Sequence, residues 1–62
     1  MLNVGAIVLD RETGGTGLVI DVWSDHSVTL DLALPGGRQV IITRNTTDLD
    51  RMGQLGRRRG RW

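Results

Sequence analysis

The sequence predicts an all-β fold: one small, strongly bent barrel of four or five short antiparallel strands, with a short helical turn near residues 46–52. The first observation is that residues 16–43 hold three hydrophobic runs in which apolar and polar side chains alternate with the period of a strand. The second is that glycine, proline and short polar residues separate these runs, as tight turns require. The third is the length of 62 residues, because a domain of this size buries only about 60% of its unfolded surface and has room for one small core.

The first strand is expected at Val4–Leu9, where a continuous apolar run suits a strand that is buried on both faces or that closes a barrel. Residues 10–15 combine charges with two glycines and predict a loop that can reach over a neighbouring surface. Asp10 and Glu12 could act as paired carboxylates for a metal or for acid–base chemistry, but no histidine or further acid clusters with them in the sequence. We therefore expect a solvated loop, in which the glycines of residues 13–17 serve as bend and bulge positions.

Residues 16–23 and 27–34 predict the second and third strands, joined by a loop of three residues. Directly opposed residues must share a face of the sheet, and this requirement pairs Val22 with Val28. The inward side chains of the two strands are then Leu18, Ile20, Val22, Val28, Leu30, Leu32 and Leu34. The outward side chains of the second strand are Val19, Asp21 and Trp23.

The fourth strand is expected at residues 38–44, and its inward side chains are Val40 and Ile42. Pairing these two with the inward leucines of the third strand leaves residues 35–37 as the loop. Pro35 suits the first corner of a type I turn, and Gly37 suits the left-handed position of the bulge that accompanies it. Turn chemistry and hydrophobic pattern therefore predict the same register for this hairpin.

The segment after residue 44 loses the alternation of a strand and favours a helical turn. Asn45, Thr46 or Thr47 can accept a hydrogen bond from the first free backbone N–H groups of such a turn. Leu49 and Met52, which follow it, are then expected to plug one end of the sheet.

Residues 1–52 are predicted to form the folded domain, and residues 53–62 a disordered basic tail. The net charge of +1 hides a division between them: the domain has four arginines against seven acids, or −3, and the tail has four arginines and no acid, or +4. Clustered guanidinium groups can neutralise phosphates, and a terminal tryptophan can stack on an unpaired base. The candidate nucleic-acid-binding residues are Arg57, Arg58, Arg59, Arg61 and Trp62. A solubilising tail and a tail folded back on the acidic domain are the alternatives.

The outer face of the predicted sheet is a second candidate surface. The predicted pairings place Val19, Asp31 and Ile41 side by side, with Trp23 next to Ser27. An apolar strip that ends in an aromatic side chain is typical either of burial against another element or of a partner site. Burial under the tail, under the first strand or in a homodimer stays open beside contact with another protein. The candidate protein-interface residues are Val19, Trp23 and Ile41.

Residues 4–8, 14–19 and 28–30 (VGAIV, GGTGLV and VTL) give a strand, a glycine-rich approach to a second strand, and a third strand after a turn. This pattern resembles the KOW motif of ribosomal and transcription-elongation proteins, one of the SH3-like small barrels. Residues 8–10, 14–17 and 20–22 are also similar to the PRC-barrel. Both resemblances imply an SH3-like small barrel and a family habit of binding RNA, ribonucleoprotein or other proteins.

The composition narrows the possible chemistry. The chain has no cysteine, which excludes disulfides and thiolate metal sites and fits a cytoplasmic location. No apolar run approaches the roughly 18 residues of a membrane span. The single histidine, His26, is expected at a solvated hairpin tip, so we predict no catalytic residue, no metal and no cofactor.

The function predicted from these observations is that of a non-catalytic binding module. Its barrel is expected to dock on a protein or ribonucleoprotein partner while the arginine-rich tail contacts nucleic acid. The alternative is a protein–protein interaction adaptor or small oligomeric subunit, in which Val19, Trp23 and Ile41 form the working surface and the tail only aids solubility.

Overall fold

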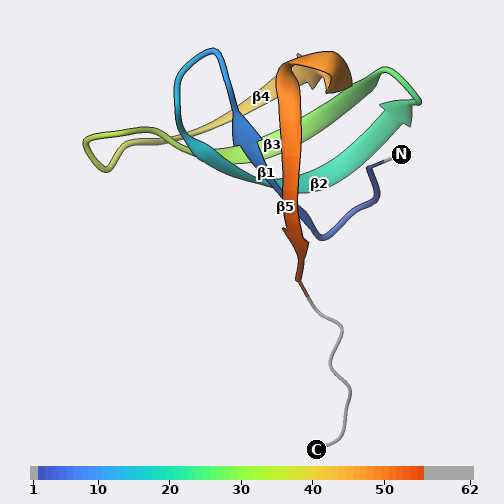
Figure 1. Ribbon diagram of the computed structural model, residues 1–62, viewed down its shortest axis with the longest axis horizontal. Helices are drawn as coiled ribbons and strands as arrows, with labels where there is room; N and C mark the ends of the chain where they lie inside the picture. Colours follow the sequence, from blue (N-terminus) through green and yellow to red (C-terminus); the bar gives the residue numbers. More distant parts are fainter. Residues whose placement is uncertain (1, 56–62) are drawn as a thin grey trace, which may run out of the picture.

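The computed structural model describes residues 2–55, which form one antiparallel sheet of five strands and a single short helical turn (Figure 1). The all-β prediction is therefore confirmed. The elements in chain order are β1 (Ala6–Asp10), β2 (Thr16–Ser24), β3 (Ser27–Ala33), β4 (Gln39–Asn45), the 3-10 turn η1 (Thr46–Asp48) and β5 (Leu49–Gln54).

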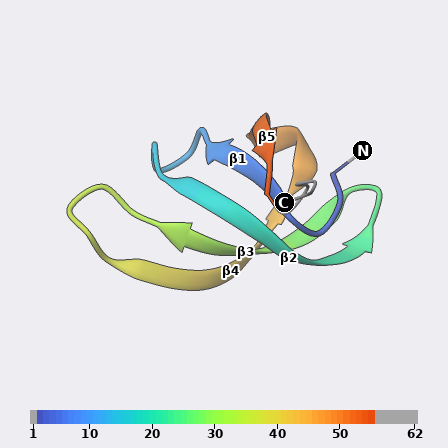
Figure 2. The ribbon, with the colours of Figure 1, turned by 90° about the horizontal axis from the view of Figure 1, so that it is seen from below.

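The strands lie in the order β4-β3-β2-β1-β5, so β4 and β5 are the two edges of the sheet. Figure 2 shows that the sheet is strongly curved, with β1 and β5 on one side and β3 and β4 on the other. Within residues 2–55 no strand pairing joins β4 to β5, and the sheet is not closed into a barrel by backbone hydrogen bonds. Side chains packed between the two sides form the core.

The core consists of eight buried apolar residues from four strands and the N-terminal segment. These residues are Leu2, Ala6, Val8, Val19, Val28, Leu30, Leu32 and Leu49, with Val22, Leu34, Val40 and Ile42 packed against them. The inward faces predicted for β3 and β4 are thus confirmed. Burying such side chains supplies the main driving force for folding, at about 25 cal/mol per Å² of apolar surface removed from water.

The inward face predicted for β2 is wrong over half its length, because a bulge interrupts the strand at Ile20. Val22 lies opposite Val28 as predicted, but the register shifts between Val19 and Asp21. Leu30 is therefore opposite Val19 instead of Ile20. One extra residue in a strand moves all side chains beyond it to the other face. Val19 is consequently buried, whereas Leu18 lies on the outer face.

β1 differs from the expectation of a strand buried on both faces. It alternates, with Ala6, Val8 and Asp10 buried and the two residues between them half-buried. Asp10 was expected in a solvated loop, and this expectation is wrong: it ends the strand with no exposed surface. Two partners of its side chain, Glu12 N and Thr13, are local, but the third, Arg44, is 34 positions away in the sequence.

β3 and β4 pair in the predicted register, but the strands end one residue earlier and begin one residue later than predicted. A hydrogen bond of 2.7 Å from Leu34 N to Arg38 O closes the turn over residues 35–37. The turn is of type II and not the expected type I, because Gly36 has a φ of +97° at the third corner. Gly37, with a φ of +95°, has the positive φ expected of it. The β2–β3 loop is shorter than predicted, since Ser24 pairs directly with Ser27.

A helical turn follows β4 as predicted, but it covers three residues only. Asn45 caps η1 by accepting a hydrogen bond from Thr47 N. Leu49 then enters the core, whereas Met52 is 61% exposed, so the expectation that Met52 plugs the sheet is wrong. β5 continues through Gln54, and the candidate residues of the tail lie outside the described residues.

Candidate interaction surfaces

The outer face of the sheet carries a strip that we call the outer strip, formed by Leu18, Trp23, Asp31 and Ile41. The pairings place Leu18 of β2 opposite Asp31 of β3, and Asp31 opposite Ile41 of β4. The Asp31–Ile41 neighbourhood predicted from the sequence is therefore confirmed. Ile41 is 68% exposed, so its apolar surface is open to a partner.

Trp23 reaches across β3 on the same face. Its Nε1 donates a hydrogen bond of 2.6 Å to Thr29 Oγ1, and Thr29 Oγ1 lies 3.2 Å from Thr43 Oγ1. The indole ring thus contacts Thr29, and Ser27 is paired with Ser24 and not with Trp23, because the second irregularity of β2 falls between Val22 and Ser24. Trp23 remains 67% exposed, so this contact orients the ring without burying it.

Val19 has no part in the outer strip. It is fully buried in the core, and its placement on the outer face was wrong. Leu18 takes the place next to Asp31 that the sequence assigned to Val19. No residue of β2 indicates this exchange locally, since both faces of the strand carry apolar residues around the bulge. Trp23 and Ile41 are on the surface, and their role as interface residues stays a prediction.

The electrostatics of the outer strip favour cations over phosphates. Asp31 sits half-buried between Leu18 and Ile41, and within residues 2–55 no hydrogen bond or ion pair is formed by its carboxylate. Asp21, which pairs with Thr29 on the same face, adds a second acid and is exposed. A polyanion is repelled by such a surface, whereas an apolar partner with a basic side chain matches it.

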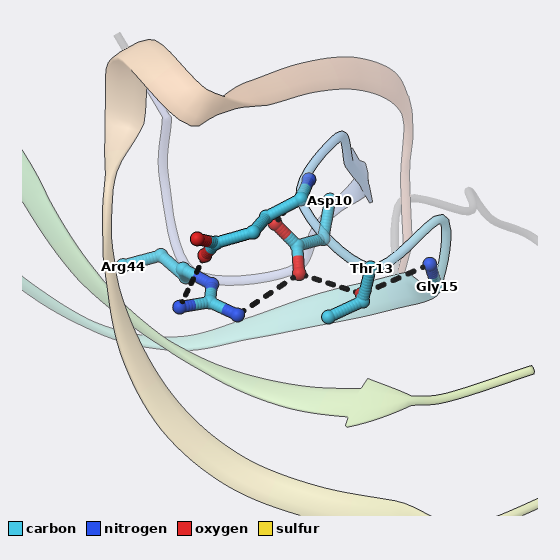
Figure 3. A network of polar contacts seen from close by, with 5 residues as sticks. Asp10, Thr13, Gly15 and Arg44 are labelled. Carbon is cyan, nitrogen blue, oxygen red and sulfur yellow. Dashed lines mark hydrogen bonds and ion pairs between the residues drawn. The ribbon is translucent and has the colours of Figure 1, made fainter.

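An ionic cluster surrounds the buried carboxylate of Asp10 (Figure 3). Asp10 Oδ2 accepts hydrogen bonds from Thr13 Oγ1 at 2.7 Å and from Arg44 at 3.3 Å, and Arg44 also reaches Glu12 at 2.9 Å. We call these four residues the Asp10 cluster. It connects the β1–β2 loop to β4, two segments that share no backbone pairing.

The pKa of Asp10 lies below its ordinary value of 3.8. Burial acts to raise this pKa, but the hydrogen bonds from Thr13 and from Glu12 N, together with the Arg44 guanidinium, outweigh it. The carboxylate is therefore ionised at neutral pH and committed to its partners. Arg44 Nε is buried without a hydrogen-bond partner, and the desolvation of this unpaired donor lowers the net stability that the cluster contributes.

The Asp10 cluster and the neighbouring Arg11 hold the β1–β2 loop in place. Arg11 N donates to Asp48 O at 3.1 Å, and the Arg11 side chain pairs with Asp50 at 3.1 Å. The loop is thus tied to η1 and β5 as well as to β4. No group of three or more histidine, cysteine or acidic residues suitable for a metal occurs in the described part of the chain.

An open hollow of about 370 Å³ lies where η1, the β2–β3 turn and the N-terminal segment meet. It is lined by Leu2, Asp25, Thr46, Leu49 and Arg51. Asp25 and Arg51 are exposed on its rim, and Thr46 Oγ1 is already bonded to Asp25 O at 3.0 Å. The hollow therefore offers few convergent polar groups to a small ligand.

Comparison of the chain with protein families, curated proteins and solved structures found no match. No helix within residues 2–55 is long and apolar enough to cross a membrane. The surfaces described above therefore have to be interpreted from their own chemistry.

Proposed function

We propose that the chain is a non-catalytic binding module, in which the sheet docks on a protein or ribonucleoprotein partner and the C-terminal arginines contact nucleic acid. The observation that supports this proposal is the division of charge, −3 in residues 1–52 and +4 in residues 53–62. Like charges that are gathered in one short segment attract a polyanion more strongly than the same charges spread among acids.

The scaffold in this proposal is an SH3-like small barrel related to the KOW motif. The strand order β4-β3-β2-β1-β5, the strong curvature and the helical turn before the last strand support it. Asp21 and Asp31 disfavour a nucleic acid on the outer face of the sheet. Their charge supports the assignment of phosphate binding to Arg57, Arg58, Arg59, Arg61 and Trp62.

Binding of a mixed-sequence single-stranded oligonucleotide, followed by fluorescence anisotropy, tests the role of the tail. Four arginines predict that the logarithm of the binding constant falls with the logarithm of salt concentration with a slope of about −3. Removal of residues 57–62 is expected to abolish binding while the circular dichroism spectrum of the sheet is retained.

The matched control for this truncation is the double variant Arg38→Gln/Arg51→Gln, which removes two exposed arginines from the described domain. It is expected to bind within about twofold of the unmodified chain. If the truncated chain keeps its affinity, or if the control loses as much as the truncation, the tail is not the nucleic-acid site.

A protein-interaction adaptor is the second candidate function, and it is favoured by the exposure of Trp23 and Ile41. These two side chains expose about two thirds of their surface on one face, at 67% and 68%. Large exposed aromatic and aliphatic side chains that share a face are typical of protein interfaces. In this case the outer strip is the working surface, and the tail only aids solubility.

The adaptor proposal predicts that Trp23→Asp removes a partner contact that resists nuclease. The measurement is co-purification from nuclease-treated source cytoplasm, with Thr16→Asp as the control because Thr16 is an exposed residue of the same strand. The control is expected to retain the partner. Equal recovery with Trp23→Asp and with the unmodified chain would exclude Trp23 from the interface.

A further inference from the structure

Within residues 2–55, no strand pairs with the outer edge of β4 along its whole length. A hydrogen bond from Leu34 N to Arg38 O marks one bonded pair at the start of the β3–β4 ladder. Bonded and non-bonded pairs alternate in an antiparallel ladder, so every second residue of β4 directs its N–H and C=O away from β3. These residues are Gln39, Ile41, Thr43 and Asn45.

This edge lacks the features that protect edge strands from pairing. Native proteins protect such edges with charged side chains, proline, bulges or very short strands. β4 has seven residues, no proline, and a register with β3 that is continuous from Ser27–Asn45 to Ala33–Gln39. Its only charged residue, Arg44, turns inward to Asp10 and Glu12.

The other edge of the same sheet is protected. The pairing of β5 with β1 shifts register between Ile7 and Val8, which places a bulge at Met52. β5 also carries Asp50 and Arg51, both exposed. The contrast between the two edges of one small sheet indicates that the edge of β4 is available to pair with another strand.

We propose that β4 pairs antiparallel with β4 of a second copy of this chain, so that the two sheets join across a two-fold axis. Arg44 is the only charged residue of β4, and a two-fold axis at Ile42 sets it opposite Val40, so this self-pairing places no like charges opposite one another. The two-fold axis brings the start of one β4 near the end of the other. Arg38 of one copy thereby approaches Asp48 of the second, and in the described residues neither side chain has an ion-pair partner.

This pairing concerns the backbone edge and goes beyond the proposed function, which uses the tail or the outer strip. It would also place the two outer strips on one continuous face, because Ile41 lies next to the junction. An interface made by one strand from each copy is small, so we expect a reversible dimer with a dissociation constant on the order of micromolar.

The test is sedimentation velocity of the full chain at increasing protein concentration, in salt high enough to screen contacts of the tail. The decisive variant is Thr43→Pro, which removes an N–H that faces away from β3 and leaves the ladder to β3 intact. Thr43→Ala is its control, because it removes the same hydroxyl but keeps the N–H. We expect Thr43→Pro to weaken dimerisation at least tenfold and Thr43→Ala to change it by less than threefold.

A second measurement keeps the test decisive if Thr43→Pro fails to fold. Arg38→Asp is expected to weaken the dimer, and Arg38→Asp combined with Asp48→Arg is expected to restore it. Hydrogen exchange of the Ile41 and Thr43 amides in the unmodified chain should slow as its concentration rises.

Three results would overturn the proposal. The first is a chain that stays monomeric at concentrations of several hundred micromolar. The second is a dimer that is unaffected by Thr43→Pro. The third is protection of these amides that does not depend on concentration, which would mean that a segment of the same chain covers the edge.

Discussion

Arg44→Ala is expected to lower the free energy of unfolding by about 3 kcal/mol, because it leaves the Asp10 carboxylate buried without its cationic partner. Asp10 has no exposed surface, and only Thr13 and the backbone N–H of Glu12 would remain to it. A domain of this size has a total stability of roughly 3–9 kcal/mol. The variant is therefore expected to lose a third or more of its stability, which urea titration followed by circular dichroism would measure.

Two controls separate the buried charge from the general loss of an arginine. Arg51→Ala removes an exposed arginine whose side chain contacts Gln54, and it is expected to change stability by less than about 0.5 kcal/mol. The double variant Asp10→Asn/Arg44→Met removes both charges and is expected to recover much of the loss. A loss below about 1 kcal/mol in Arg44→Ala would mean that the guanidinium does not stabilise the carboxylate.

The same carboxylate predicts how stability depends on acid. Its folded-state pKa is lowered, so its contribution is fully present above the unfolded pKa near 3.8 and is lost as the pH falls through the lower folded value. The unmodified chain is therefore expected to lose stability below about pH 4 more steeply than Asp10→Asn. Urea midpoints measured between pH 2 and 7 would check this, and parallel profiles would contradict it.

Gly15→Ala is expected to destabilise the fold by about 2 kcal/mol, because the added methyl group clashes with the backbone of β3 just before β2 begins. A Cβ at this position would lie 2.5 Å from the carbonyl oxygen of Ala33 and 3.2 Å from Leu32 Cδ1. The obstacle is a main-chain oxygen, which cannot turn aside as a flexible side chain can. The shift would also disturb Gly15 O, which accepts a 2.8 Å hydrogen bond from Asp10 N. Thermal unfolding followed by circular dichroism measures the loss.

Gly53→Ala is the matched control for this substitution. A Cβ at Gly53 meets no atom within 4 Å, and its φ is not positive. Removing a glycine where the backbone conformation tolerates alanine reduces the entropy of the unfolded chain, so stability is expected to be unchanged or to rise by up to about 1 kcal/mol. Equal effects of the two substitutions would show that close packing at Gly15 is not what the glycine provides.

The β3–β4 hairpin could be predicted from the sequence because its alternation is strict and its Pro-Gly-Gly turn agrees with that alternation. β2 could be predicted as a strand, but its register with β3 could not be predicted, since no residue type near Ile20 indicates a bulge there. Asp10 was misplaced for a different reason. The arginine that makes its burial possible is 34 positions away, and composition within a loop gives no sign of such a contact.

Among the surface residues, too, those whose position depends on their own strand could be predicted, and those whose position depends on a bulge or on strand order could not. The exposure of Trp23 and Ile41 followed from the alternation of their own strands, whereas Leu18 entered the outer strip through the bulge. The contrast between the two sheet edges needed the strand order, which depends on the pairing of β1 with β5. Sequence periodicity describes the faces of a strand but not its neighbours.

The position of β5 beside β1 has a consequence for how the chain folds. The two hairpins that link β2, β3 and β4 are short-range and can form while later residues are still being added. β1, by contrast, meets its second neighbour only through pairs such as Ala6 with Gln54, the most distant in the sequence. Closing so long a loop costs more conformational entropy than closing either hairpin. We therefore expect β1, the first strand in the chain, to be the last strand to pair with both of its neighbours, β2 and β5.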